Sequence, residues 1–327
     1  MDRRTFVAAF GGVLVGCARI AWAQQAGKVW RVGYLAGGVP SPDGAVPLLL
    51  RNELNVLGFV EQKDVVFDGR WAEGHNERLP ALAAELLTRR VDLIVAFGDP
   101  AAQAAKQTSS TVPVIALSAG DMAETGLVAS LARPGGNVTG VNDPAAVLAA
   151  KRLAILKELV PTAKRMAVLW NAGNYAMTLR YREIEREAKS LGITIDPLGV
   201  REPDEFDSAL AAMDRARPDA LMMLTDALTN LNRQRVLDYV SSRQIPGIYE
   251  FGYVVKAGGL VSYGSDPSES LRLAARYVAK VLKGARPADL PVEQPNRYFL
   301  VINLKTARSL GLNIPPSLLV RADEVIE

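Results

Sequence analysis

Acidic and polar side chains stand directly after several apolar, strand-like runs of this sequence. Asp99 follows the run 91–97, and Asp226 follows the run 220–224. Ligands of open parallel sheets bind beyond the carboxyl ends of the strands, so side chains at these positions can contact a small molecule. Glycines at the same positions let a ligand approach the backbone. The candidate ligand-binding residues are Gly37, Gly38, Gly98, Asp99, Ser118, Asp121, Asn171, Tyr175, Asp226 and Glu250.

The chemistry of this set suits a ligand that carries both charges. Free amides at helix N-termini favour anionic groups such as carboxylates. The carboxylates among the candidates could oppose a cationic group such as an amine. Simpler structural interpretations remain open, since Asp99 and Asp121 stand where they could only cap helices. Turn formation or packing alone would explain Gly37, Gly38, Asn171 and Tyr175.

The sequence contains few of the side chains that catalysis or metal binding would need. The chain holds one histidine, His75, and one cysteine, Cys17. A zinc site needs several such ligands, and a Ser-His-Asp triad needs a placed imidazole. His75 stands in a Gly- and Asn-flanked stretch that predicts a surface turn. We find no dinucleotide fingerprint, P-loop, HExxH or GxSxG motif, so we expect no catalytic residue, no metal and no cofactor. A hydrolase that uses carboxylates alone is a remote alternative.

Residues 1–23 have the pattern of a signal peptide. A charged start is followed by an apolar run over 6–16, and then by the small-x-small site Ala21-Trp22-Ala23. Arg3-Arg4 also fits the twin-arginine export pattern. The run before Cys17 has the form of a lipoprotein cleavage box, so lipidation there is an alternative to cleavage after Ala23. Either way we expect export to the periplasm, by the general secretory or the twin-arginine route.

Length and charge limit the classes of protein that fit. A chain of 327 residues predicts two domains, and 49% hydrophobic with 22% charged residues is typical of globular proteins. The formal charge of +3 includes three arginines and one aspartate of the leader, so the mature chain is close to neutral. No basic run is long enough to indicate nucleic-acid binding.

Two successive arrays of alternating strands and helices make up the rest of the chain. Apolar runs at 30–35, 64–71, 91–97 and 112–117 predict the strands of the first array. A breaker cluster at 133–137 precedes the second array, whose strands we expect at 166–170, 193–195, 220–224 and 247–249. Such alternation predicts α/β lobes with mostly parallel sheets.

The segment after residue 250 must return to one lobe or the other. A chain that crosses two or three times between lobes would create a hinged cleft. We therefore expect the first lobe to hold residues 28–141 plus about 252–285. The second lobe would hold residues 142–251 plus about 286–327.

Several stretches resemble one protein family along essentially the whole chain. They include Arg133-Pro134-Gly135-Gly136-Asn137-Val138-Thr139-Gly140-Val141. Others are Gly126–Leu131, Ala257–Gly264 and Val301–Ala307. The sequence resembles the ABC transporter substrate-binding proteins, a family with tryptophan- and tyrosine-binding members. The resemblance implies a type I periplasmic-binding-protein fold with two Rossmann-like lobes, three crossovers and a closing cleft. It also implies delivery of a ligand to a membrane permease.

The sequence departs from the family pattern at two candidate positions. Many relatives have Thr or Ser after the glycine that follows the third strand, whereas this chain has Asp99. Relatives often show Tyr-Pro-Phe where this chain has Tyr249-Glu250-Phe251. An acid in place of a hydroxyl would repel a ligand carboxylate and favour a cation. We expect a monomer that captures a small polar or amphoteric, amino-acid-like solute. A module that signals to a membrane receptor kinase is the alternative.

Overall fold

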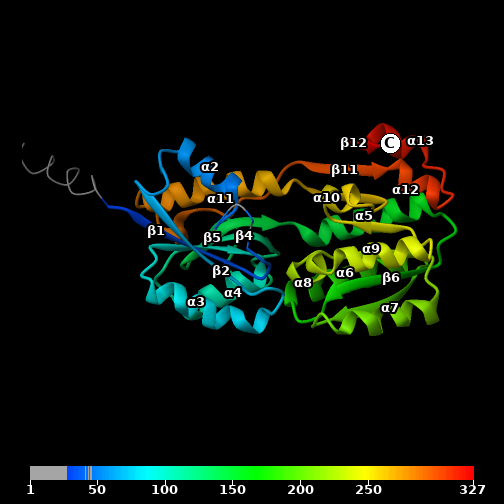
Figure 1. Cartoon of the computed structure of the whole chain (residues 1–327), viewed down its shortest axis with the longest axis horizontal. Helices are drawn as coiled ribbons and strands as arrows, with labels where there is room; N and C mark the ends of the chain where they lie inside the picture. Colours follow the sequence, from blue (N-terminus) through cyan, green and yellow to red (C-terminus); the bar gives the residue numbers. More distant parts are fainter. Residues whose placement is uncertain (1–27, 41, 43, 45) are drawn as a thin grey trace, which may run out of the picture.

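The computed structural model describes residues 28–40, 42, 44 and 46–327, and the chain forms two α/β lobes (Figure 1). The predicted signal peptide and Cys17 lie outside the described residues. Within the described part of the chain, no helix combines the length and apolar character needed to cross a membrane. The fold class predicted from the two strand–helix arrays is confirmed.

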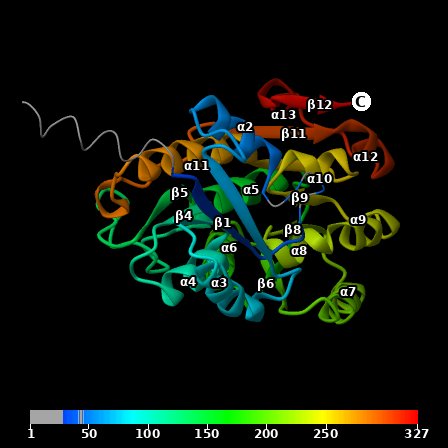
Figure 2. The same cartoon turned by 60° about the vertical axis from the view of Figure 1, so that its left-hand side comes forward.

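The first lobe is built on a five-stranded parallel sheet with the order β2-β1-β3-β4-β5. Helices α3 and α4 cover one face, and α2 and α11 pack together over the other (Figures 1 and 2). Its inner strands β3 and β4 are nearly all apolar, as is typical of parallel strands that are covered on both faces. The elements are β1 (Trp30–Ala36), α2 (Leu48–Val56), β2 (Val65–Trp71), η1 (Asn76–Arg78), α3 (Leu79–Thr88), β3 (Leu93–Phe97), α4 (Asp99–Thr108), β4 (Val114–Gly120), β5 (Val138–Asp143) and α11 (Pro267–Leu282).

The second lobe is built on a seven-stranded sheet with the order β12-β11-β10-β9-β8-β6-β7. All its neighbouring strands run parallel except β10 and β11, which are antiparallel. The strands are β6 (Arg165–Asn171), β7 (Thr194–Val200), β8 (Ala220–Met223), β9 (Gly247–Tyr249), β10 (Val261–Ser265), β11 (Tyr298–Asn303) and β12 (Glu324–Ile326). The helices are α5 (Ala145–Leu159), α6 (Tyr175–Ser190), α7 (Glu205–Ala216), α8 (Ala227–Leu231), α9 (Arg233–Ser242), α10 (Gly252–Lys256), α12 (Leu304–Ser309) and α13 (Pro316–Arg321).

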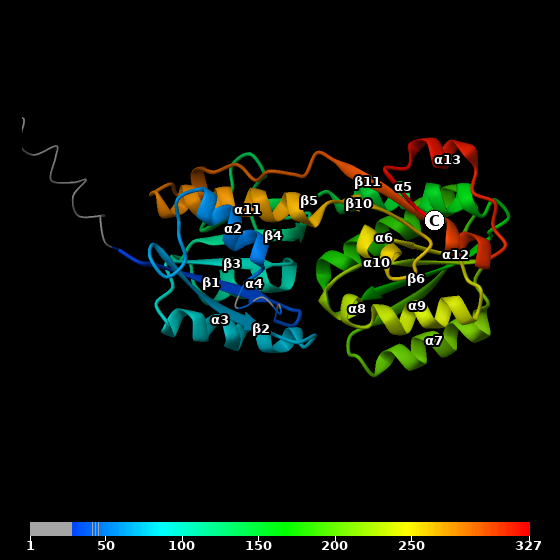
Figure 3. The ribbon, with the colours of Figure 1, turned by 45° about the horizontal axis from the view of Figure 1, so that its top comes forward.

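The chain passes between the lobes three times (Figure 3). The passages run from β5 into α5, from β10 into α11, and from η2 (Pro287–Asp289) to β11. The third passage first follows β5, because the Val292 N–H donates to the Leu131 carbonyl (2.7 Å) and the Glu293 N–H donates to that of Gly140 (3.0 Å). Three parallel connections at one side of the molecule form the hinge that the sequence predicted.

The stretch 252–265 lies in the second lobe, whereas the sequence assigned it to the first. It forms α10 and β10, and β10 pairs with β9 and β11. The return to the first lobe begins at Pro267, where the Asp266 side chain caps α11 by accepting from the Ser268 N–H (2.8 Å). The sequence of a short apolar strand does not indicate which of two sheets the strand joins. The boundary between the lobes therefore becomes clear only from the pairing of β10 with β9 and β11.

Candidate functional site

A cleft of about 370 Å³ lies between the lobes, beyond the carboxyl ends of strands from both sheets. Side chains from β1, β2 and β3 form one wall, and residues of α6, α8 and the loop after β9 form the other. Its aromatic lining is extensive and comprises Tyr34, Trp71, Phe97, Phe251 and Tyr253.

Seven of the ten residues predicted from the sequence line this cleft. The structure therefore brings together candidates from both lobes that lie up to 213 positions apart, from Gly37 to Glu250. Asp121, Asn171 and Tyr175 are not part of the lining. The lining members of the predicted set are Gly37, Gly38, Gly98, Asp99, Ser118, Asp226 and Glu250.

Asp226 presents a carboxylate to the cleft that is held only by neutral donors. One oxygen accepts from the Asn171 amide (2.6 Å) and more weakly from that of Asn174 (3.4 Å). The other accepts from the Thr229 N–H (3.1 Å) in a capping box at the start of α8. Burial raises the pKa of Asp226, and these hydrogen bonds oppose the rise. Asn171 is thus a support residue beneath Asp226, and Asn174, which the sequence did not single out, lines the cleft itself.

Glu250 is paired inside the protein, contrary to the expectation that it would oppose a ligand cation. One carboxylate oxygen lies 2.9 Å from Arg152 and 3.3 Å from Arg180. The other accepts from the Thr225 N–H (3.1 Å). Glu250 is only 1% exposed, so two guanidinium groups neutralise its charge before any ligand arrives.

Arg180 ties the second lobe to the first, and the sequence analysis did not find it. Its guanidinium reaches from α6 to Asp143 at the end of β5 (3.2 Å). It also packs on Gly120, where an added Cβ would lie 2.5 Å from Nη2. The α6 sequence is rich in charge and indicates a solvated helix. However, Arg180 falls on the buried stripe with Met177 and Ile184, and that spacing was the available signal.

Asp99 is the first residue of α4 and is 5% exposed. The N-cap is Gly98, with φ of 85°, and α4 has no side-chain cap. Capping therefore does not explain the carboxylate. Its Oδ1 atom is buried without a hydrogen-bond partner, and the nearby Thr125 hydroxyl lies outside hydrogen-bond geometry. Burial raises the pKa of Asp99 to about 6, while Thr125 and Arg180 lower it.

Asp121 and Tyr175 lie beside the cleft. The residues after Asp121 form turns where a helix was expected, since its carbonyl accepts from the N–H groups of Glu124 (2.8 Å) and Thr125 (2.9 Å). Burial raises the pKa of Asp121, and Arg180 lowers it. Tyr175 begins α6 and is 55% exposed. The preceding Asn174 caps that helix by accepting from the Ala176 N–H (3.1 Å).

Contacts between the lobes also close the mouth of the cleft. His75 Nδ1 lies 3.3 Å from Glu77 and 3.6 Å from Glu202, which belongs to the second lobe. A Cβ added at Gly74 would lie 3.3 Å from Leu231 of α8. His75, Glu77 and Glu202 form the one group of histidine and acidic side chains in the described ranges whose ligand atoms lie close enough to hold an ion together. All three side chains are substantially exposed, which fits a polar contact at the surface.

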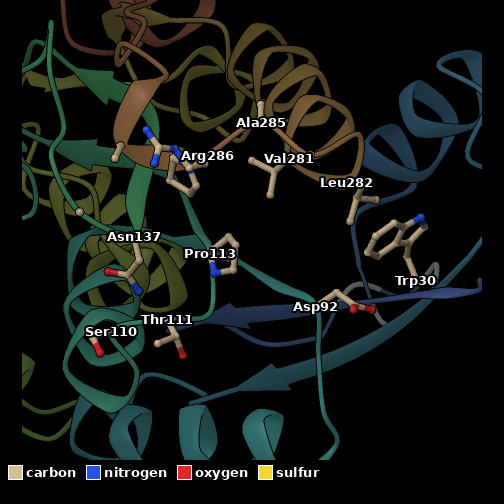
Figure 4. A pocket seen from close by; sticks show the side chains of 14 residues that line it. Trp30, Asp92, Ser110, Thr111, Pro113, Asn137, Val281, Leu282, Ala285 and Arg286 are labelled. Carbon is tan, nitrogen blue, oxygen red and sulfur yellow. The ribbon is translucent and has the colours of Figure 1, made fainter. Parts of the chain in front are cut away.

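A second pocket, of about 480 Å³, lies at the amino ends of the strands of the first sheet, away from the interlobe cleft (Figure 4). Trp30, Asp92, Pro113 and Asn137, which precede or begin its strands, contribute to the lining. The Asn137 amide donates to two backbone carbonyls, both at 2.8 Å, so it serves the fold. This pocket has no convergent charged groups comparable to those of the interlobe cleft.

Comparison with known proteins points to one family. The family described as "ABC transporter substrate binding protein" matches residues 50–326. A tyrosine-binding protein from Clostridioides difficile is 27% identical over 255 residues, which cover 78% of this chain and 73% of that protein.

Solved structures agree with this match. A conserved domain protein from Vibrio cholerae has a TM-score of 0.85 at 26% identity, over 91% of this chain and 100% of the other. A domain from Streptococcus pneumonia in complex with L-Trp has a TM-score of 0.82 at 28% identity, with the same coverage. The ligand-free, open structure of a Clostridium difficile substrate-binding protein gives a TM-score of 0.63 at 24% identity, over 91% and 99% of the chains.

Proposed function

Because the chain belongs to the ABC transporter substrate-binding protein family, we propose that it is the extracytoplasmic solute-binding component of an importer. It captures a small polar or amphoteric, amino-acid-like ligand between its lobes and delivers it to a permease of the inner membrane. The observation that carries this proposal is Asp226, a cleft-lining carboxylate fixed by Asn171, Asn174 and Thr229 without an ion-pair partner among the described residues.

Recognition divides between a polar and an apolar part of the cleft. A ligand ammonium would replace the missing cation at Asp226, as a charge-assisted hydrogen bond that gains strength in the partly desolvated cleft. The aromatic side chains provide area for an apolar or aromatic ligand body. Thr225 Oγ1, in the cleft lining, is buried without a hydrogen-bond partner and is available to a further polar group.

Delivery depends on lobe closure around the ligand. A ligand that contacts both lobes stabilises the closed arrangement relative to the open one. The contacts of Arg180 with Asp143, and of His75 with Glu202, join the lobes in the present arrangement. The higher similarity to the L-Trp complex than to the ligand-free open structure is consistent with a closed form.

Calorimetric titration of the mature protein tests this function. The panel holds amino acids, aromatic and aliphatic amines, and short peptides. We expect one compound class to bind with one molecule per chain and to be recovered unchanged. Absence of binding across the panel, together with no change in scattering, would contradict a transport role. A transport assay in cells that lack the chain separates import from signalling to a receptor kinase.

We also propose that the mature protein works in the periplasm as a monomer. Mass spectrometry of the exported protein checks how the leader is processed. A chain that begins at Gln24 indicates cleavage after Ala23, and a chain that begins at a lipidated Cys17 indicates anchoring.

A further inference from the structure

We infer that the cleft selects a ligand with net positive charge: an amine on an aromatic or other apolar body, without a free carboxylate. This inference rests on the proposed function and narrows its ligand class. It follows from which charges around the cleft are already neutralised and which are not.

Five carboxylates surround the floor of the cleft, and they fall into two groups. Glu250 and Asp143 are paired with guanidinium groups. Asp99, Asp121 and Asp226 are in no ion pair with any described residue. Burial raises the pKa of all three, which marks them as carboxylates without sufficient compensation.

Asp99 gives the clearest indication of a missing partner. It is 95% buried, it lines the cleft, and its Oδ1 atom has no hydrogen-bond partner. A buried carboxylate oxygen without a partner is costly unless a ligand supplies a donor. Because Asp99 lies in the first lobe and Asp226 in the second, a cation between the lobes would be attracted by both.

Two of the three cations near the cleft are already held by carboxylates. Arg152 donates to Glu250 (2.9 Å) and to the Tyr263 carbonyl (2.6 Å). Arg180 is held by Glu250 and Asp143.

The backbone of Gly120 also covers Arg180, and the Nε atom of Arg180 has no hydrogen-bond partner. Arg233, the remaining guanidinium in the lining, donates to the Asn230 carbonyl (2.8 Å) and lies 6.0 Å from the Tyr253 ring. Five carboxylates thus lie at or beside the cleft with three guanidinium groups. Arg152 and Arg180 are paired with carboxylates, whereas the partners of Arg233 are neutral.

The walls of the cleft suit the remainder of such a ligand. The Tyr34 and Trp71 rings lie 5.0 Å apart, and the Phe251 and Tyr253 rings lie 5.7 Å apart. Phe97 is 40% exposed at the cleft. Aromatic faces attract cations and also pack against an apolar body. A zwitterionic amino acid would gain the same apolar contacts but would bring its carboxylate toward the unpaired acids.

Matched pairs of compounds test the inference by calorimetry at pH 7.5: tryptamine against tryptophan, and tyramine against tyrosine. We expect the amine of at least one pair to bind about tenfold more tightly than its amino acid. Equal or tighter binding of the amino acids would overturn the inference while leaving the proposed function intact. Failure of all four compounds to bind would also overturn the inference. The proposed function is tested separately, by the wider panel of compounds described above.

Variants of Asp99 give an independent measure. Asp99→Ser, which removes the charge and keeps a hydrogen-bonding hydroxyl, should weaken binding of the amine about tenfold and leave binding of the amino acid unchanged or tighter. Asp99→Asn serves if the serine variant does not fold, as judged by thermal melting. Asp238→Ser, an exposed aspartate of α9, is the matched control. An unchanged preference in both Asp99 variants would contradict a role for this carboxylate.

Discussion

At the scale of single residues, the cleft holds carboxylates that are paired with arginines and carboxylates that are not. Glu250 and Asp226 follow adjacent strands, β9 and β8, yet one is paired with two arginines and the other with two asparagines. Sequence position predicts that both lie at the cleft. It does not predict their partners, because Arg152 and Arg180 come from helices 70–100 residues away.

Replacing Asp226 with asparagine removes the negative charge and keeps the shape of the side chain. Asp226→Asn should weaken binding of the tighter of tryptamine and tryptophan by about thirtyfold, since a charge-assisted hydrogen bond is worth about 2 kcal/mol. Calorimetry gives the dissociation constants, and Asp238→Asn is the control. A variant that binds as tightly as the native protein would remove Asp226 from the site.

The raised pKa of Asp99, about 6 in the folded state, makes stability depend on pH. Between about pH 4 and 6 the folded state holds a proton that the unfolded state has released, so this residue makes stability fall as pH rises. Asp99→Asn should therefore increase the free energy of unfolding at pH 7.5, by up to about 3 kcal/mol, and less at pH 4.5. Urea denaturation at both pH values checks this. An identical change at both values would contradict the assignment.

At the scale of elements, sequence patterns predicted β1 to β4 and β6 to β9, because apolar runs bounded by glycine and proline mark buried parallel strands. They predicted no strand where β5 and β12 lie. They failed for residues 121–131, where turns replace a helix, and for the sheet that β10 joins. They also missed Arg152 and Arg180, since charged residues on a helix normally face solvent. For Arg180, its spacing with the buried Met177 and Ile184 was the one available signal of burial.

A substitution at Gly120, at the end of β4, tests whether the contact between β4 and α6 sets the closed arrangement of the lobes. A Cβ there would meet the Arg180 guanidinium at 2.5–3.2 Å, so Gly120→Ala should displace that guanidinium from its contact between the lobes and weaken ligand binding roughly tenfold. Gly136→Ala is the control, because an added Cβ has no neighbour within 4 Å there. Calorimetry on both variants measures the effect. Equal affinities would mean that Arg180 does not set the closed arrangement.

At the scale of the whole molecule, two sheets joined by three passages make a clamp around a charged and aromatic cleft. The sequence predicted the two lobes and seven of the residues that line the cleft, but none of its aromatic side chains. It could not predict the charge balance, which arises only when both lobes bring their side chains together. Under the proposed function, the binding energy of the ligand favours the closed form over the open form.

Small-angle X-ray scattering during titration with the tightest-binding compound tests this account most directly. The account predicts that the radius of gyration falls as the ligand is added. The change should saturate at one ligand per chain and reach the value of the two-lobed arrangement described above. Saturated binding with an unchanged radius of gyration would contradict capture by lobe closure.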